Sequence, residues 1–203
     1  MRWLSWGVFG WIVLSGGATV ATGQTTVGPV TTTAISGYNA AELTWLAVGE
    51  GPFGINEVSW WEDSDKPCFM RIGVRTLKEP ASFGGQQQID ICNPGLVDYF
   101  VGTETKTVTF QSNPRHVVRG VAACTNNKDN HRLKGVRIYA AKVWTTSEQV
   151  EELSVSDQED RPNCATWHRA VYCPVDQIAS ALVVHHSDKE ITGLALRCRK
   201  VEY

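Results

Sequence analysis

The sequence predicts an all-β fold, organised as a single domain that is cross-linked by disulfides. Three observations support this prediction. Short apolar or alternating runs, separated by Gly, Pro, Asn and Asp, follow one another from residue 41 onward, whereas helical periodicity is scarce. The chain has six cysteines, an even number. A length of 203 residues favours one domain with a sizeable core.

The first residues have the pattern of a cleaved secretory signal. Arg2 is followed by the apolar stretch 3–14 and then by small residues. Among these, Ala21 or Gly23 satisfies the small-x-small rule for cleavage. We therefore expect residues 1–23 to be a signal peptide, the mature protein to be secreted and extracellular, and no membrane span to remain after cleavage.

A polar leader follows the signal. Residues 24–36 contain five threonines together with Gly28 and Pro29, and nothing obvious to bury, so we expect an extended arm. Residues 37–203 are then the single disulfide-rich β domain. The formal net charge of -2 lacks the basic excess of a nucleic-acid binder, so no nucleic-acid partner is expected.

The cysteines are expected to form three disulfides, because secretion places them in an oxidising compartment. The six are Cys68, Cys92, Cys124, Cys164, Cys173 and Cys198. Many pairings are possible in principle. The spacing favours Cys68 with Cys92 and Cys173 with Cys198, since each pair encloses a segment that ends in an alternating strand. Cys124 then pairs with Cys164. Each loop of such a length stabilises the fold by about 3 kcal/mol.

Three segments alternate clearly enough to be expected as strands. In 106–110, Val108 and Phe110 share one face, opposite two threonines. In 192–198, the core side ends at Cys198, so a buried disulfide is expected. The third segment, 132–144, places Val136, Ile138, Ala140 and Trp144 on one side, with Lys142 interrupting this apolar face near its end.

Segment 147–160 differs from the rest of the chain. It carries six acidic residues and no basic one. We expect it to be a solvated loop or one short helix. As an alternative, an exposed acidic segment of this kind docks on a basic protein partner.

A weak internal repeat is visible in three segments that begin with Gly120, Gly135 and Gly193. Each glycine is followed by alternating small or apolar residues and comes after a polar turn and an apolar strand. This arrangement predicts a repeated β-hairpin or a unit of three to four strands.

The C-terminal part of the chain resembles a known repeat. Trp167 precedes the dipeptide Cys173-Pro174, and a polar turn then leads to Gly193-Leu194-Ala195-Leu196 and Cys198. This pattern resembles the repeat of vitelline membrane outer layer protein 1, over residues 164–203 and in part over 116–144. That family is a β-prism of three sheets in an extracellular egg coat and has been linked to oligosaccharide binding. The resemblance therefore favours a β-prism over a two-sheet sandwich and implies a carbohydrate-facing groove.

The candidate ligand-binding site is a turn rich in aromatic and acidic residues: Trp60, Trp61, Glu62, Asp63 and Asp65. In a strand the two tryptophans point to opposite faces, so we expect one in the core and the other exposed beside the acids. An exposed aromatic ring stacks on a sugar ring, and carboxylates accept hydrogen bonds from the hydroxyl groups of the sugar. As an alternative, the clustered carboxylates serve a glycoside hydrolase or transglycosylase.

No metal or cofactor is expected. Zinc-ligating atoms are present in Cys164, His168, Cys173, His185 and His186, but the spacing Cys-x3-His-x4-Cys matches no common zinc pattern. Segment 126–130 offers oxygen ligands without the spacing of a calcium loop, so a polar turn is expected. Common catalytic motifs are missing as well. We therefore expect a non-enzymatic extracellular protein, either a coat or matrix component or a lectin-like module, with glycans or matrix and coat proteins as partners.

Overall fold

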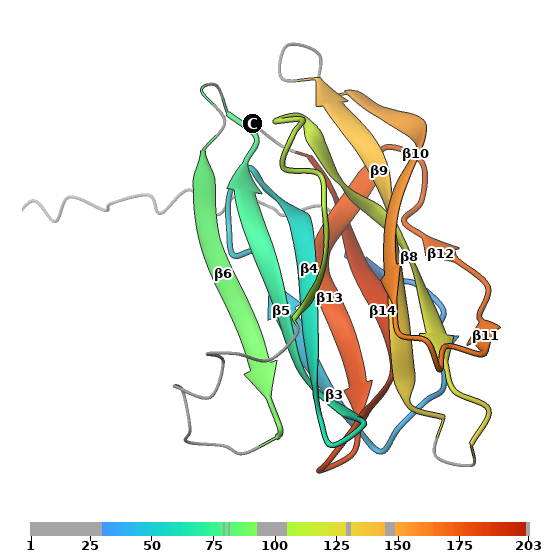
Figure 1. Ribbon diagram of the computed structural model, residues 1–203. Helices are drawn as coiled ribbons and strands as arrows, with labels where there is room; N and C mark the ends of the chain where they lie inside the picture. Colours follow the sequence, from blue (N-terminus) through green and yellow to red (C-terminus); the bar gives the residue numbers. More distant parts are fainter. Residues whose placement is uncertain are drawn as a thin grey trace, which may run out of the picture.

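The computed structural model shows an all-β protein, as the sequence predicts (Figure 1). It describes residues 30–78, 80, 82–92, 105–128, 131–144 and 149–201. The predicted signal peptide, residues 1–23, lies outside the described residues. Within the described part of the chain, no helix is long and apolar enough to span a membrane.

The strands form three antiparallel sheets. Sheet A contains β1 (Thr31–Thr32), β2 (Ser36–Gly37), β3 (Glu42–Ala47), β13 (Gln177–His186) and β14 (Ile191–Lys200). Its order is β1-β14-β13-β3, and β2 also pairs with β14. Sheet B has the order β6-β5-β4-β7. Its strands are β4 (Phe53–Asp63), β5 (Lys66–Thr76), β6 (Phe83–Asp90) and β7 (Lys106–Thr109).

Sheet C has the order β10-β9-β8-β11, and β12 also pairs with β8. It contains β8 (His116–Thr125), β9 (Leu133–Trp144), β10 (Gln149–Asp160), β11 (Thr166–Trp167) and β12 (Val171–Tyr172). Three sheets around one core make a β-prism rather than a two-sheet sandwich.

All three sheets contribute to one hydrophobic core. Trp60 of sheet B, Ile138 of sheet C and Leu194 of sheet A belong to the same buried cluster. Burying an aliphatic side chain of this size stabilises the fold by about 1.5–3 kcal/mol. The three predicted strands are present as β7, β9 and β14, and Val108, Ile138 and Leu194 from their apolar faces lie in this core. Trp144, predicted on the same face as Ile138, is only half-buried and lies outside the core.

The predicted disulfide pairing is confirmed. Cys68 bonds Cys92, Cys124 bonds Cys164, and Cys173 bonds Cys198. As expected, Cys198 is fully buried. The pair Cys124–Cys164 joins β8 to the segment that follows β10, which fixes where that segment crosses sheet C.

The acidic segment is not a loop or a helix, and this prediction is wrong. Residues 149–160 form β10, an edge strand of sheet C. The acids suit an edge, because charge discourages another chain from pairing there. Two of them also have partners in sheet B: Asp157 accepts the Thr109 backbone N–H at 2.7 Å, and Glu159 pairs with Lys106 at 3.7 Å.

The described part of the predicted arm is extended and attached to sheet A. Thr31 and Thr32 pair with the C-terminal strand as β1, and Ser36 and Gly37 do so as β2. The hydroxyl of Ser36 accepts the Ala123 backbone N–H at 2.9 Å, which ties the arm to sheet C as well.

The three glycines of the weak repeat share a structural role. A Cβ on Gly193 would overlap the backbone of Tyr38, and one on Gly120 would overlap the ring of Tyr172. At Gly135 a Cβ would lie 3.2 Å from the indole of Trp167. Each glycine thus lets a segment from elsewhere in the chain lie close against a sheet.

Candidate functional site

The two tryptophans of the predicted site are both buried, so the expectation of one exposed ring is wrong. Trp60 lies in the core that the three sheets share, with no exposed surface, and Trp61 is only 5% exposed. Alternation does put the rings on opposite faces of β4. The second face is covered too, because Trp61 packs with Phe69 and with the Cys68–Cys92 disulfide.

The acids of the same segment lie at a tight hairpin turn. Asp63 pairs with Lys66, and the two residues between them, Ser64 and Asp65, have φ angles of 50° and 69°. Two successive residues with positive φ are typical of a type I′ turn, which matches the twist of the flanking strands. Asp63 is exposed, and its side chain accepts a hydrogen bond from the Ser64 hydroxyl.

Lys134 of β9 binds the other two acids. Its ammonium group, which has no exposed surface, lies 2.9 Å from Glu62 Oε1 and 2.8 Å from Asp65 Oδ1. It also donates to the backbone carbonyl of Asp65 at 2.8 Å. Three charge-assisted hydrogen bonds therefore satisfy a buried cation.

This cluster connects the turns of all three sheets. Arg132 lies 3.4 Å from Asp65 Oδ2 and 2.6 Å from Glu190 Oε2, which belongs to the β13–β14 turn. The β4–β5, β8–β9 and β13–β14 turns meet at the lower end of the prism (Figure 1). We call this the charge-paired end, defined by Glu62, Asp65, Arg132, Lys134 and Glu190.

The electrostatics of this end oppose acid catalysis by Asp65. The hydrogen bond from Lys134 lowers the pKa of the Asp65 carboxyl, and Asn163 and Lys128 act in the same direction, although partial burial opposes them. A general acid needs a carboxyl whose pKa is raised toward the working pH. Asp65 is instead held as a carboxylate.

The zinc-type atoms are engaged in other interactions. Cys164 and Cys173 are in disulfides, and the Nε2 of His168 lies 2.7 Å from the hydroxyl of Thr125. Burial, together with His131, lowers the pKa of His168, so its ring is neutral near pH 7. Among the described residues, no three His, Cys, Asp or Glu side chains are grouped to hold a metal ion.

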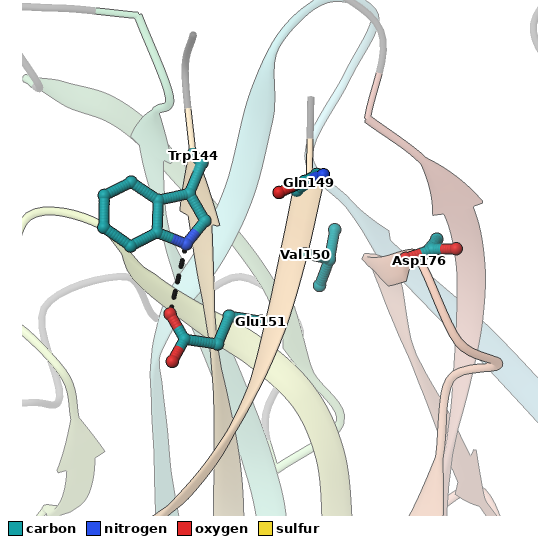
Figure 2. A pocket seen from close by; sticks show the side chains of 5 residues that line it. All are labelled: Trp144, Gln149, Val150, Glu151 and Asp176. Carbon is teal, nitrogen blue, oxygen red and sulfur yellow. Dashed lines mark hydrogen bonds between the residues drawn. The ribbon is translucent and has the colours of Figure 1, made fainter. Parts of the chain in front are cut away.

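An open hollow lies at the other end of β9. Its volume is about 490 Å³, and Figure 2 shows the five side chains that line it: Trp144, Gln149, Val150, Glu151 and Asp176. Lys134 is the second residue of β9 and Trp144 the last, so the strand separates the hollow from the charge-paired end. We call this feature the Trp144 hollow.

Three parts of the chain build the Trp144 hollow. β9 ends at Trp144, and the first three residues of β10 supply Gln149, Val150 and Glu151. Asp176 comes from the turn that precedes β13, where its φ of 61° helps the chain to reverse. The hollow is therefore formed by two neighbouring strands and one turn from sheet A.

Three contacts orient the indole of Trp144. Its Nε1–H donates to Glu151 Oε2 at 3.1 Å, as Figure 2 shows. The ammonium of Lys142 lies 3.6 Å from the ring centroid, and the guanidinium of Arg115 lies 5.8 Å from it. Such cation–π contacts stabilise the position of an indole by about 0.5–1 kcal/mol each at exposed sites.

The groups in the hollow suit a polyhydroxylated ligand. An indole offers an apolar face to the C–H groups of a sugar ring, and carboxylates and an amide accept or donate hydrogen bonds at its hydroxyls. His116 is nearby. Burial and the charge of Lys142 lower its pKa, against the opposing effect of Glu151, so it is uncharged near pH 7.

The sequence pattern did not reveal this site. It placed Trp144 on the core side of its strand, but the ring is half-buried and lines the hollow. The available signal was Lys142, two residues earlier, where this face of β9 stops lining the shared core. Asp176 carries no comparable signal, since sheet A brings it to the hollow from a distant part of the sequence.

Comparison with known proteins identifies the fold. No family model matches the sequence, and no curated protein matches it significantly. The wild-type Malaysian banana lectin is similar in structure, with a TM-score of 0.51, 8% identity, and coverage of 85% of this chain and 99% of that one. A Calsepa lectin structure, solved in complex with a biantennary N-glycan, gives a TM-score of 0.53, 11% identity, and coverage of 86% and 99%. At such low identities the likeness concerns the fold alone.

Proposed function

We propose that this protein is a secreted, non-enzymatic glycan-binding module of lectin type, and that the Trp144 hollow is its binding site. The observation that carries the proposal is the composition of this hollow. It combines one oriented indole with two carboxylates and an amide, in an open space of about 490 Å³. Sugar sites need this combination of one apolar face with several hydrogen-bonding groups.

The fold supports the same function. Two β-prism proteins of similar structure are lectins, and one of them was solved with a bound glycan. Because a fold hosts many functions, this likeness adds support only together with the hollow. The sequence resemblance to vitelline membrane outer layer protein 1 is consistent with a β-prism coat or matrix component.

Secretion is part of the proposal. Residues 1–23 are the proposed signal peptide, and three disulfides suit an oxidising compartment. The partners are then extracellular glycans, on cell surfaces or in a coat or matrix. Recovery of the protein from culture medium with its first residue near position 24, shown by intact mass, tests this part.

The experiment is a binding titration of the mature protein with oligosaccharides that end in mannose, galactose or N-acetylglucosamine. We expect at least one to bind, and Trp144→Ala to weaken its binding by about tenfold or more, because anchoring aromatic residues dominate small interfaces. The control is Asp63→Asn, which removes the exposed carboxylate of the segment predicted from sequence. Loss of binding in D63N with none in W144A would return the site to residues 60–65.

A glycoside hydrolase is the alternative. It is supported by Glu151 and Asp176, two carboxylates that line one hollow, rather than by Glu62 and Asp65, which Lys134 holds. Incubation with polysaccharides and an assay for new reducing ends separates the two functions. Turnover that disappears in both Glu151→Gln and Asp176→Asn would favour the enzyme.

A protein partner is the second alternative. Among the described residues, β10 is the edge strand of sheet C, and it carries the exposed acids Glu151 and Glu152. Binding of a basic protein here would weaken strongly as salt shortens the Debye length from about 10 Å at 0.1 M to about 3 Å at 1 M. Sugar binding in the Trp144 hollow would change little over the same range.

A further inference from the structure

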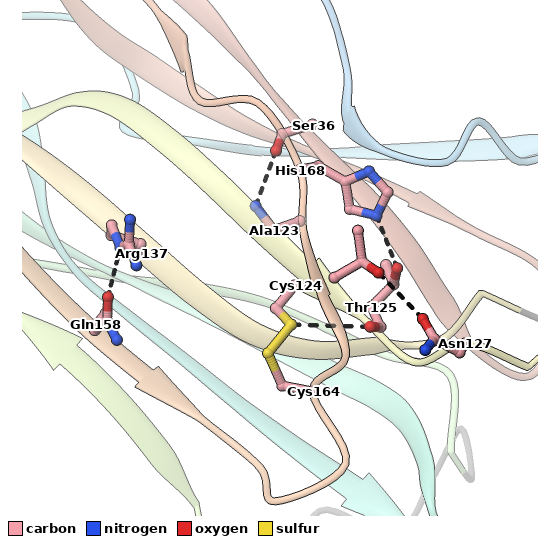
Figure 3. Close-up of a disulfide and its surroundings, with 10 residues drawn as sticks. Ser36, Ala123, Cys124, Thr125, Asn127, Arg137, Gln158, Cys164 and His168 are labelled. Atoms are coloured by element: carbon pink, nitrogen blue, oxygen red, sulfur yellow. Dashed lines mark hydrogen bonds between the residues drawn. A yellow bond between two sulfur atoms is a disulfide. The ribbon is translucent and has the colours of Figure 1, made fainter.

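A second surface with aromatic rings lies on the outer face of sheet C. The guanidinium of Arg137 lies 4.5 Å from the ring centroid of Trp167. Its Nε–H donates to Gln158 Oε1 at 2.6 Å, the bond drawn in Figure 3. The row continues with Tyr139, whose hydroxyl lies 3.4 Å from Arg137, and with Tyr172, whose ring centroid lies 5.0 Å from that of Tyr139. We call Trp167, Arg137, Tyr139 and Tyr172 the sheet C platform.

The backbone is arranged to let these rings lie close to the sheet. Gly135 leaves room for the indole of Trp167, and Gly120 leaves room for the ring of Tyr172. Both aromatic residues belong to the segment that follows β10, and its short strands β11 and β12 pair with β8. The Cys124–Cys164 disulfide ties the start of that segment to β8 (Figure 3).

The platform carries one positive charge that lacks an acidic partner. Among the described residues, Arg137 contacts a neutral amide, a phenol and an indole, and pairs with no carboxylate. This is unusual beside β10, which is rich in acids. The positions of β10 opposite Arg137 and Tyr139 are the neutral residues Gln158 and Ser156.

The neighbouring acids are engaged elsewhere or lie at the border. Asp157 and Glu159 alternate with those neutral positions and interact with sheet B. Glu152 pairs with Arg119, whose guanidinium lies 5.6 Å from the ring centroid of Tyr172. Asp160, opposite Gly135, marks the acidic border of the platform.

We propose that the sheet C platform binds an acidic sugar residue, one bearing a carboxylate or a sulfate group, of an extracellular polysaccharide. Arg137 takes the anionic group, because its planar guanidinium binds such groups through paired hydrogen bonds. The exposed ring of Tyr172 and the ring of Trp167 contact the sugar itself. This inference rests on the proposed glycan-binding function for its ligand class, but it uses a surface separate from the Trp144 hollow.

The test compares three polymers of similar length: hyaluronan oligosaccharides, chondroitin sulfate oligosaccharides and neutral dextran. We expect at least one of the two acidic polymers to bind and Arg137→Gln to weaken that binding by about tenfold or more, since charge-assisted hydrogen bonds are lost. Arg137→Lys keeps the charge but not the planar fork, so it should restore binding only in part. Lys189→Gln removes one charge from an exposed turn and is the matched control.

The outcomes separate this inference from the proposed function. Loss of acidic-polymer binding in R137Q, with neutral-oligosaccharide binding in the Trp144 hollow intact, supports the platform. Equal binding of wild type and R137Q to the acidic polymers, or no acidic binding at all, overturns it while leaving the hollow untouched. Polyglutamate that binds in an Arg137-dependent way, when neither acidic polysaccharide binds, would assign the platform to acidic proteins instead.

Discussion

The two ends of the prism use charge in different ways. At the charge-paired end, Lys134 is fully buried against Glu62 and Asp65, and Arg132 extends the network to the third sheet. At the other end, Trp144 and Glu151 border an open hollow, and the nearby cations lie over an indole rather than between two carboxylates. One end closes the fold, and the other is open to solvent.

The contrast between the two ends indicates which cluster of chemical groups to regard as functional. The sequence concentrates aromatic and acidic residues at 60–65, and the structure uses most of them to join sheets. Breaking a buried ion pair is costly, because the remaining charge has lost both water and partner. Changes at the charge-paired end should therefore affect stability, whereas changes at the Trp144 hollow should affect binding.

The largest expected effect follows from removal of Lys134. In Lys134→Ala the largely buried side chain of Glu62 loses its closest cation, and we expect a loss of about 3–5 kcal/mol in the free energy of unfolding, measured by chemical denaturation. The double variant with Glu62→Gln should recover part of this loss. A single-variant loss below about 1 kcal/mol would show that this end does not hold the sheets together.

A smaller effect concerns the stability of the fold in mild acid. Burial lowers the pKa of both His168 and His185 below the usual 6.5, so the unfolded chain binds protons that the folded chain does not. Stability is then complete above pH 6.5 and falls as the pH drops through the lowered pKa values. We expect Tm to decrease by a few degrees between pH 7.5 and 5, and less in His168→Gln. A Tm that stays constant or rises over this range would contradict the conclusion that folding lowers the pKa values of these two histidines.

The smallest expected effect sharpens the role of the other end. Glu151→Gln keeps a hydrogen-bond acceptor for the Trp144 indole but removes the charge that lies 4.0 Å from Lys142. We expect glycan affinity to fall by roughly two- to fivefold, with no measurable change in unfolding free energy. Loss of stability in place of affinity would mean that the hollow is part of the structural framework.

Much of the fold was predictable because it depends on local patterns. The alternation in 106–110 and 192–198 marks strands with one buried face, and the spacing of the cysteines gave the pairing that the structure shows. The acidic strand β10 was missed, because an edge strand buries little and lacks a continuous apolar face.

The candidate site was less predictable, because it depends on contacts between distant segments. Alternation showed that Trp60 and Trp61 face opposite ways, but it could not show that the Cys68–Cys92 disulfide and Phe69 cover the second face. The partner of Glu62 is likewise 72 residues away in β9. Such coverage is decided by the packing of three sheets, which no local pattern records.

The most direct test of the difference between the two ends is an NMR titration with an oligosaccharide that binds the protein. The titration follows the indole N–H signals of the tryptophans. Single Trp→Phe variants assign the signals. We expect the signal of Trp144, whose N–H donates to Glu151 at the edge of the hollow, to shift progressively and saturate, while those of the buried Trp60 and Trp61 stay in place. A Trp144 signal that does not move when the ligand is saturating, with shifts at Trp60 or Trp61, would contradict the assignment of the binding site.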